Sequence, residues 1–141
     1  MTRVNWQRFM IGALIATVID FLSDGFLHEV LVRRQWEDVY ARLGVPEPQH
    51  SATGLFYFVL FDLGRGFVAM FLYVMMRARY GPGPRTAIWA GIISWIALSL
   101  TGPAQFIPLG FFSVSLWLIA AAYQLVTSIL ATLAGAATYK E

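Results

Sequence analysis

The sequence contains no cysteine and carries little charge. The lack of cysteine excludes structural disulfides, thiolate metal sites, iron–sulfur clusters and cysteine nucleophiles. Only 13% of the residues are charged, whereas an average soluble domain has about a quarter. Hydrophobic residues make up 58% of the chain, and the mean hydropathy is +0.63. A soluble fold of 141 residues has too small an interior to bury this much apolar surface, so the composition predicts an integral membrane protein.

Motifs of well-known catalytic and nucleic-acid-binding sites are missing as well. The sequence has no glycine-rich phosphate loop, no nucleophile elbow and no zinc-protease helix. Its net charge is +2, and no dense basic tract accompanies it, so we expect no nucleic-acid partner. We therefore expect a protein that is not an enzyme.

Four apolar segments are candidates for membrane spans. A helix needs about 20 residues to cross the hydrocarbon core of a bilayer. The segments do not alternate apolar and polar residues, as the strands of a membrane barrel do. The sequence predicts an all-α integral membrane four-helix bundle, formed by residues 1–141 as one transmembrane domain. We expect the third helix to be short and bent; the four helices are expected at about residues 9–32, 55–76, 87–102 and 113–138.

A shorter helix is expected between the first two spans, at about residues 34–44. Trp36, Val39, Tyr40 and Leu43 recur there at helical spacing, and charged residues occupy the rest of the wheel. Such an amphipathic helix is typical of a segment that lies in the membrane interface.

The distribution of lysine and arginine predicts the orientation. With both termini on one side, that side carries six basic residues and the opposite side carries three. Because basic loops are retained in the cytoplasm, we expect a multi-pass protein of the inner (cytoplasmic) membrane with both termini cytoplasmic. The six residues are Arg3, Arg8, Arg77, Arg79, Arg85 and Lys140.

An intramembrane polar layer is the main candidate site. Asp20 and Asp24 share one face of the first helix, and Asp62 and Arg65 share one face of the second. If these helices are antiparallel, the four side chains lie between seven and twelve residues from the outer helix ends. Gln124 lies eleven residues into the fourth helix, at the same level. We therefore expect Arg65 to bridge carboxylates with its planar guanidinium.

Two interpretations of this layer stay open. The first is an ion-paired clasp that holds the first two helices together. The second is a proton or cation site, since charged groups inside a membrane often mark transport pathways. Three carboxylates against one guanidinium leave a net charge of −2 if all are ionised, and protonation of at least one buried aspartate, a water-filled vestibule or a partner's cation would compensate it.

Histidine is the other candidate ligand. His28 follows Asp20 and Asp24 at steps of four residues, near the outer end of the first helix. It is able to ligate the iron of haem or the magnesium of chlorophyll, or to hold a metal together with Glu29 and Asp24. A boundary histidine bonded to water or a carboxylate is the simpler interpretation. We expect no bound metal, and a cofactor only if haem or chlorophyll binds at His28.

Small residues mark expected helix-packing faces. Gly64 and Gly66 flank Arg65, and Ala131 and Gly135 stand four residues apart on the fourth helix. Such residues allow another backbone to approach closely.

Several stretches of the sequence resemble small bacterial inner-membrane proteins with four helices. They are RFMIGALIATVIDFLSDGFLHEVL, QWEDVYARLG, DLGRGF and RYGPGPRTAIWAG. The resemblance implies the topology and a bacterial cytoplasmic membrane. The function of that group is uncharacterised, so no site residue is carried over.

We expect a non-enzymatic subunit that packs against and stabilises a larger membrane complex, photosynthetic or respiratory. Its partners would be lipid and other membrane subunits, or further copies of the chain. The first alternative is a small proton- or cation-coupled transporter or channel that uses Asp20, Asp24 and Arg65. The second is haem or chlorophyll binding through His28.

Overall fold

The computed structural model describes residues 4–140, and this range is helical without strands. Four helices are long and apolar enough to cross a membrane, namely Trp6–Leu31, Ala52–Tyr80, Pro84–Ala104 and Val114–Thr138. The predictions of an all-α chain and of a multi-pass membrane protein are thereby confirmed at the level of length and composition. Arg3, which entered the count of basic residues, lies outside the described range.

The first and second spans are joined by two short helices. The first span comprises α1 (Trp6–Phe26) and one π-helical turn, η1 (Leu27–Leu31). The chain then forms α2 (Arg33–Leu43), which ends at Gly44 with a φ of 65° that only glycine adopts readily. A 3₁₀ turn, η2 (Pro48–His50), leads into α3 (Ala52–Tyr80).

The third span is longer than the sequence pattern predicts. It runs through α4 (Pro84–Trp95), a π-helical stretch η3 (Ile96–Leu100) and α5 (Thr101–Ala104). The hydroxyl of Thr101 donates to the carbonyl oxygens of Ile96 and Ala97, at 2.9 and 3.1 Å. Because the π-helical turn and this hydroxyl satisfy backbone groups ahead of Pro103, the helix continues past the residue at which a bend was expected.

The last span is α6 (Val114–Thr138), and polar caps set the starts of three spans. The side chains of Asn5, Ser51 and Ser113 accept hydrogen bonds from the backbone N–H three residues ahead. Each cap satisfies one of the N–H groups that a helix start leaves free. The first two helices consequently begin three residues earlier than their apolar runs predict.

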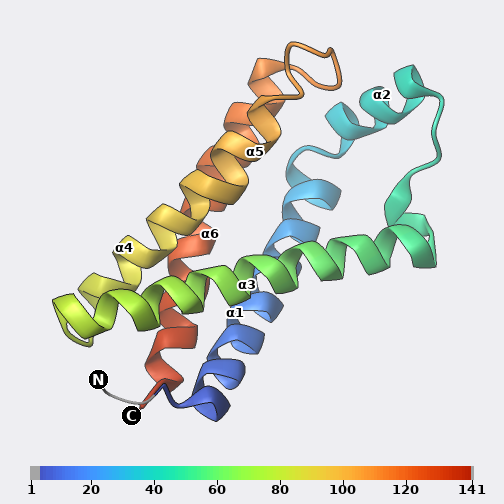
Figure 1. The fold of residues 1–141 in the computed structure, drawn as a ribbon. Helices are drawn as coiled ribbons and strands as arrows, with labels where there is room; N and C mark the ends of the chain where they lie inside the picture. Colours follow the sequence, from blue (N-terminus) through green and yellow to red (C-terminus); the bar gives the residue numbers. More distant parts are fainter. Residues whose placement is uncertain (1–3, 141) are drawn as a thin grey trace.

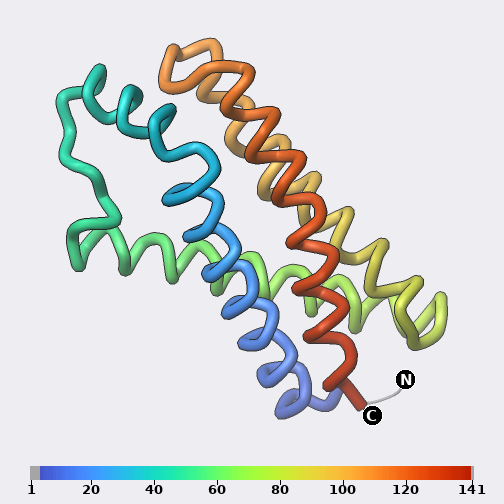
Figure 2. Tube along the Cα trace, turned by 180° about the vertical axis from the view of Figure 1, so that it is seen from behind, coloured from blue at the N-terminus to red at the C-terminus, as the bar shows by residue number. Residues whose placement is uncertain are grey.

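The long helices do not all run alongside one another. α1 and α4 both pack against α6, whereas α3 crosses α1, α4 and α6 obliquely (Figures 1 and 2). The start of α1 and the end of α6 meet at one end of the molecule, where Asn5 N donates to the Tyr139 hydroxyl at 3.2 Å. We call this the terminal end. The opposite loop end holds α2 and residues 105–113, where Arg42 donates to the Phe111 carbonyl at 3.3 Å.

Small residues let the helices approach closely near the terminal end. A Cβ atom added at Gly66 of α3 would lie 2.6 Å from the Ala13 carbonyl oxygen on α1. One added at Gly12 of α1 would lie 2.8 Å from the Gly135 carbonyl oxygen on α6. Real Cβ atoms do not tolerate such distances, so glycine is required at both crossings. A tightly packed apolar cluster around Met70 fills the remaining space between the helices.

Candidate functional site

Arg65 lies at the crossing of α1 and α3 and contacts three carboxylates. Its Nη1 donates to Asp24 Oδ2 at 2.6 Å and to Asp62 Oδ1 at 2.9 Å. Its Nη2 donates to Asp20 Oδ1 at 3.2 Å. The structure therefore brings together the four charged residues that helical spacing placed at one level. We call Asp20, Asp24, Asp62 and Arg65 the ionic cluster.

The ionic cluster is buried unevenly. The side chains of Arg65, Asp20 and Asp62 are only 2–3% exposed, whereas that of Asp24 is 13% exposed. Charges away from water require partners, and a guanidinium supplies several donors in one plane. Arg65 is the only cationic side chain that contacts these carboxylates among the described residues. The cluster thus contains three carboxyl groups and one guanidinium.

α6 extends the ionic cluster with two polar side chains. Gln124 Nε2 donates to Asp24 Oδ2 at 3.1 Å and, more weakly, to Oδ1 at 3.3 Å. Ser128, one turn further along α6, accepts a long hydrogen bond of 3.4 Å from Arg65 Nη2. Ser128 was not part of the predicted layer, although its spacing of four residues from Gln124 places it on the same helix face.

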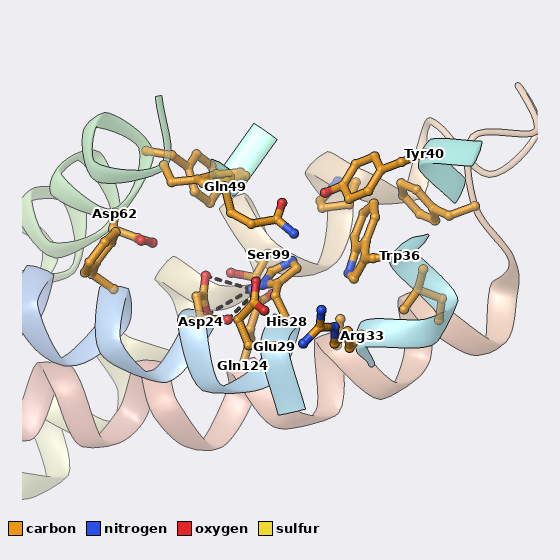
Figure 3. A pocket seen from close by; sticks show the side chains of 18 of the residues that line it. Asp24, His28, Glu29, Arg33, Trp36, Tyr40, Gln49, Asp62, Ser99 and Gln124 are labelled. Carbon is orange, nitrogen blue, oxygen red and sulfur yellow. Dashed lines mark hydrogen bonds between the residues drawn. The ribbon is translucent and has the colours of Figure 1, made fainter. Parts of the chain in front are cut away.

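A cavity of about 560 Å³ connects the loop end to the ionic cluster. Its lining extends from the exposed side chains of Arg33 and His50 to the buried carboxylate of Asp62. α1, α2, α3, η3 and α6 all contribute to its walls. Figure 3 shows Asp24, Ser99 and Gln124 gathered at its centre, with the carboxylate of Asp62 pointing toward them. No pattern of residues along the chain indicates this cavity, because it depends on how the helices cross.

Aromatic rings form much of the cavity wall. Trp36 of α2 stacks on Tyr40 with ring centroids 5.6 Å apart, and it meets Phe112 at 5.9 Å. Burial raises the pKa of the Tyr40 phenol above its ordinary value, so this ring stays neutral at physiological pH. The other aromatic rings of the wall are Phe21, Phe58, Phe61 and Trp117.

Two buried polar atoms in the cavity lining have no hydrogen-bond partner among the described residues. They are the hydroxyl oxygen of Ser99 and the indole nitrogen Nε1 of Trp36. By contrast, the indole N–H groups of Trp95 and Trp117 donate to backbone carbonyls at 2.9 and 3.1 Å. Buried polar groups are nearly always paired, and these two atoms are enclosed by protein, so the donor and the hydroxyl are places in the cavity wall where hydrogen-bonding capacity is unused.

His28 and Glu29 also line the cavity. The Nδ1 atom of His28 lies 2.8 Å from the backbone oxygen of Asp24, and the ring lies 5.4 Å from that of Trp36. Within residues 4–140 no group of three or more His, Asp or Glu side chains is arranged to hold a metal ion. A pigment bound through His28 stays a prediction.

The small residues predicted to pack between helices differ in burial. Gly66, Ala131 and Gly135 are buried between helices of this chain. Gly64 is exposed, and a Cβ atom there would meet nothing within 4 Å. Three of the four positions are therefore used for packing within the chain itself.

No family model, curated protein or solved structure matches this chain. Its function is therefore argued from the cavity and the ionic cluster.

Proposed function

We propose that this protein is a small membrane carrier that binds a cation at the ionic cluster and couples its passage to protons or to a second cation. The supporting observation is the cavity that leads from the exposed loop end to Asp24 and Asp62. An excess of carboxylates at the inner end of an apolar cavity attracts positive charge and repels anions. Charged groups inside membranes commonly serve ion and proton pathways.

The proposal places the four long helices across a bilayer as a bundle, with α2 in the interface at the loop end. Trp36 and Tyr40 of α2 are residue types that favour this depth. Arg8, Arg77 and Arg79 lie toward the terminal end, and this basic charge supports the proposal that the terminal end faces the cytoplasm of a bacterial cell. The cavity then opens to the outer face of the inner membrane.

Access to the ionic cluster is one-sided in this conformation. On the terminal side of Arg65, the contacts of Gly66 with Ala13 and of Gly12 with Gly135 leave no room for a cation. An arriving cation would meet Asp24 first, because its carboxylate is the most exposed of the three. It would compete there with Arg65 and Gln124 for the carboxylate oxygens. Loosening of the crossing between α1 and α3 would then open the opposite side.

The test is transport by the purified chain in liposomes. Fluxes of protons, monovalent metal cations and a small aromatic ammonium are compared for the wild type, Asp24→Asn and the control Asp38→Asn. Asp38 is exposed on α2 and does not line the cavity, so its substitution makes the same change of charge outside the site. We expect Asp24→Asn to lower flux at least about tenfold while the protein still unfolds cooperatively. Wild-type flux no greater than that of empty liposomes would refute the carrier.

The second candidate function is the accessory subunit, favoured by one surface. The first part of α3 extends past the other helices, and its Phe56 and Tyr57 side chains are 61% and 63% exposed (Figure 1). A partner subunit could cover this arm. Mild solubilisation of native membranes, followed by identification of co-purifying proteins, tests this. Visible absorbance in the same preparation, lost in His28→Ala, would instead indicate a bound pigment.

A further inference from the structure

We infer that the cavity binds a protonated primary amine that carries an apolar, preferably aromatic, body. This inference rests on the proposed cation-binding function and names the class of ligand.

The inner end of the cavity is acidic and underused. Asp24 and Asp62 both line it, whereas Asp20 does not. Arg65 shares its donors among all three carboxylates and so satisfies each only in part. A ligand with one positive charge would reduce the remaining negative charge of the cluster, and an anion would increase it.

Three acceptor atoms with spare hydrogen-bonding capacity belong to residues that line the cavity, and the third of them, in Ser99, would reach a ligand after a rotation of its side chain. Asp62 Oδ2 accepts no hydrogen bond from the described residues, because Arg65 bonds to Oδ1. Asp24 Oδ1 accepts only the 3.3 Å bond from Gln124. The Ser99 hydroxyl, whose residue is 3% exposed, has no described partner. A primary ammonium has three N–H donors, which equals this number of acceptors, whereas a quaternary ammonium has none.

The wall suits an apolar body more than a hydrated ion. Aromatic side chains form much of the wall, and aromatic rings attract cations and pack against other rings. Phe61 already does so within the chain, with the Arg65 guanidinium 5.8 Å from its ring centroid. The cavity volume of about 560 Å³ lies within the range of about 300–1,000 Å³ that small organic ligands occupy.

A matched set of probes tests this with the purified full chain in detergent. Binding of phenylethylamine, its N-trimethyl analogue and phenylethanol is measured by calorimetry. The two cations share a charge and a ring but differ in N–H donors, and the alcohol lacks the charge. We expect the primary amine to bind at least about tenfold more tightly than the trimethyl analogue, and the alcohol to show no binding.

Two substitutions locate the ammonium. Ser99→Ala removes one acceptor, so we expect it to lower the affinity for the primary amine severalfold and to leave the affinity for the trimethyl analogue unchanged. Ser115 is an exposed serine on α6, so Ser115→Ala is the control and should change neither affinity. Asp62→Asn should weaken the binding of both cations, because it removes a negative charge from the site. If Asp62→Asn does not fold, the differential effect of Ser99→Ala still decides.

The outcomes separate this inference from the proposed function. Equal affinity for the two cations, or an equal effect of Ser99→Ala on both, overturns the primary-amine assignment and leaves a cation site in place. Tighter binding of phenylethanol than of the amine overturns it as well. If neither cation binds and the liposomes show no flux, both the ligand class and the carrier are wrong.

Discussion

The two ends of this molecule are built from the same helices but pack in opposite ways. Toward the terminal end, glycines at the crossings of α1 with α3 and α6 and a cluster around Met70 hold these helices in close contact, and a pocket of about 460 Å³ lies apart from them between the end of α3 and the start of α4. Toward the loop end, the helices diverge and aromatic rings enclose a cavity. The ionic cluster lies at the boundary. Small residues at a crossing therefore close one end, and the oblique direction of α3 opens the other.

The largest expected effect comes from removing the cation at this boundary. Arg65→Ala leaves three carboxylates without their shared partner, and breaking a buried ion pair costs about 3–5 kcal/mol. We expect a large fall in the unfolding temperature in detergent. Adding Asp20→Asn and Asp62→Asn should recover part of it, because the uncompensated charge is removed. An unchanged unfolding temperature for Arg65→Ala would show that the cluster does not hold the helices together.

The closed end can be disturbed with a single methyl group. Gly66→Ala forces a Cβ atom against the Ala13 carbonyl oxygen, and overpacking of this kind costs about 1–3 kcal/mol. Gly64→Ala, two residues away on the same helix, meets open space and should be neutral or slightly stabilising. Thermal unfolding of the pair measures the difference. Equal effects would mean that the two helices are not in close contact at Gly66.

Loss of an indole N–H should destabilise the protein less at Trp36, in the cavity wall, than at Trp95, where the N–H is hydrogen-bonded. Trp95→Phe removes an indole N–H bonded to the Ala121 carbonyl, a loss of about 1 kcal/mol beyond the change in ring size. Trp36→Phe makes the same change in ring size but removes an N–H with no described partner. We expect the unfolding temperature to fall more for Trp95→Phe. The reverse order would show that the Trp36 indole is hydrogen-bonded in the ligand-free protein.

The smallest effect concerns Tyr40 at the cavity wall. Burial raises the pKa of its phenol above 10.0, its ordinary value. The folded protein therefore holds this proton more tightly than the unfolded chain does, and stability falls as pH rises above about 10. The loss should be smaller in Tyr40→Phe. The unfolding temperatures of the wild type and of Tyr40→Phe are measured between pH 8 and 11. If the two temperatures change with pH in parallel, Tyr40 does not contribute.

Helical spacing predicted the level of the charged groups but not their contacts. Counting along each helix placed Arg65 between the heights of Asp20 and Asp24, because an α-helix rises by a fixed distance per residue. The same count identified Gln124 on α6. Ser128 was not assigned to the layer, because a serine on an apolar helix has no pattern that distinguishes packing from hydrogen bonding. The unpaired Ser99 and Trp36 atoms depend on which neighbours reach them, and sequence spacing does not give that.

Helix ends show the same division. The apolar runs located the four spans, but the caps at Asn5 and Ser51 extended two of them. The π-helical stretch before Pro103 carried the third span past its expected bend, because the Thr101 hydroxyl satisfies carbonyl groups there. Local polar groups decide such boundaries, and a single polar residue is harder to recognise in a sequence than a long apolar run.

The order of residues alone predicts a helical chain, four segments long enough to cross a membrane, and a shared level for three acids and one arginine. These follow from composition and from the regular geometry of a single helix. Only the tertiary structure decided that α3 crosses its neighbours obliquely and that a cavity reaches Asp24 and Asp62 from the loop end. Both depend on contacts between residues far apart in the chain, such as Gly66 with Ala13, where the shape of facing surfaces sets the angle.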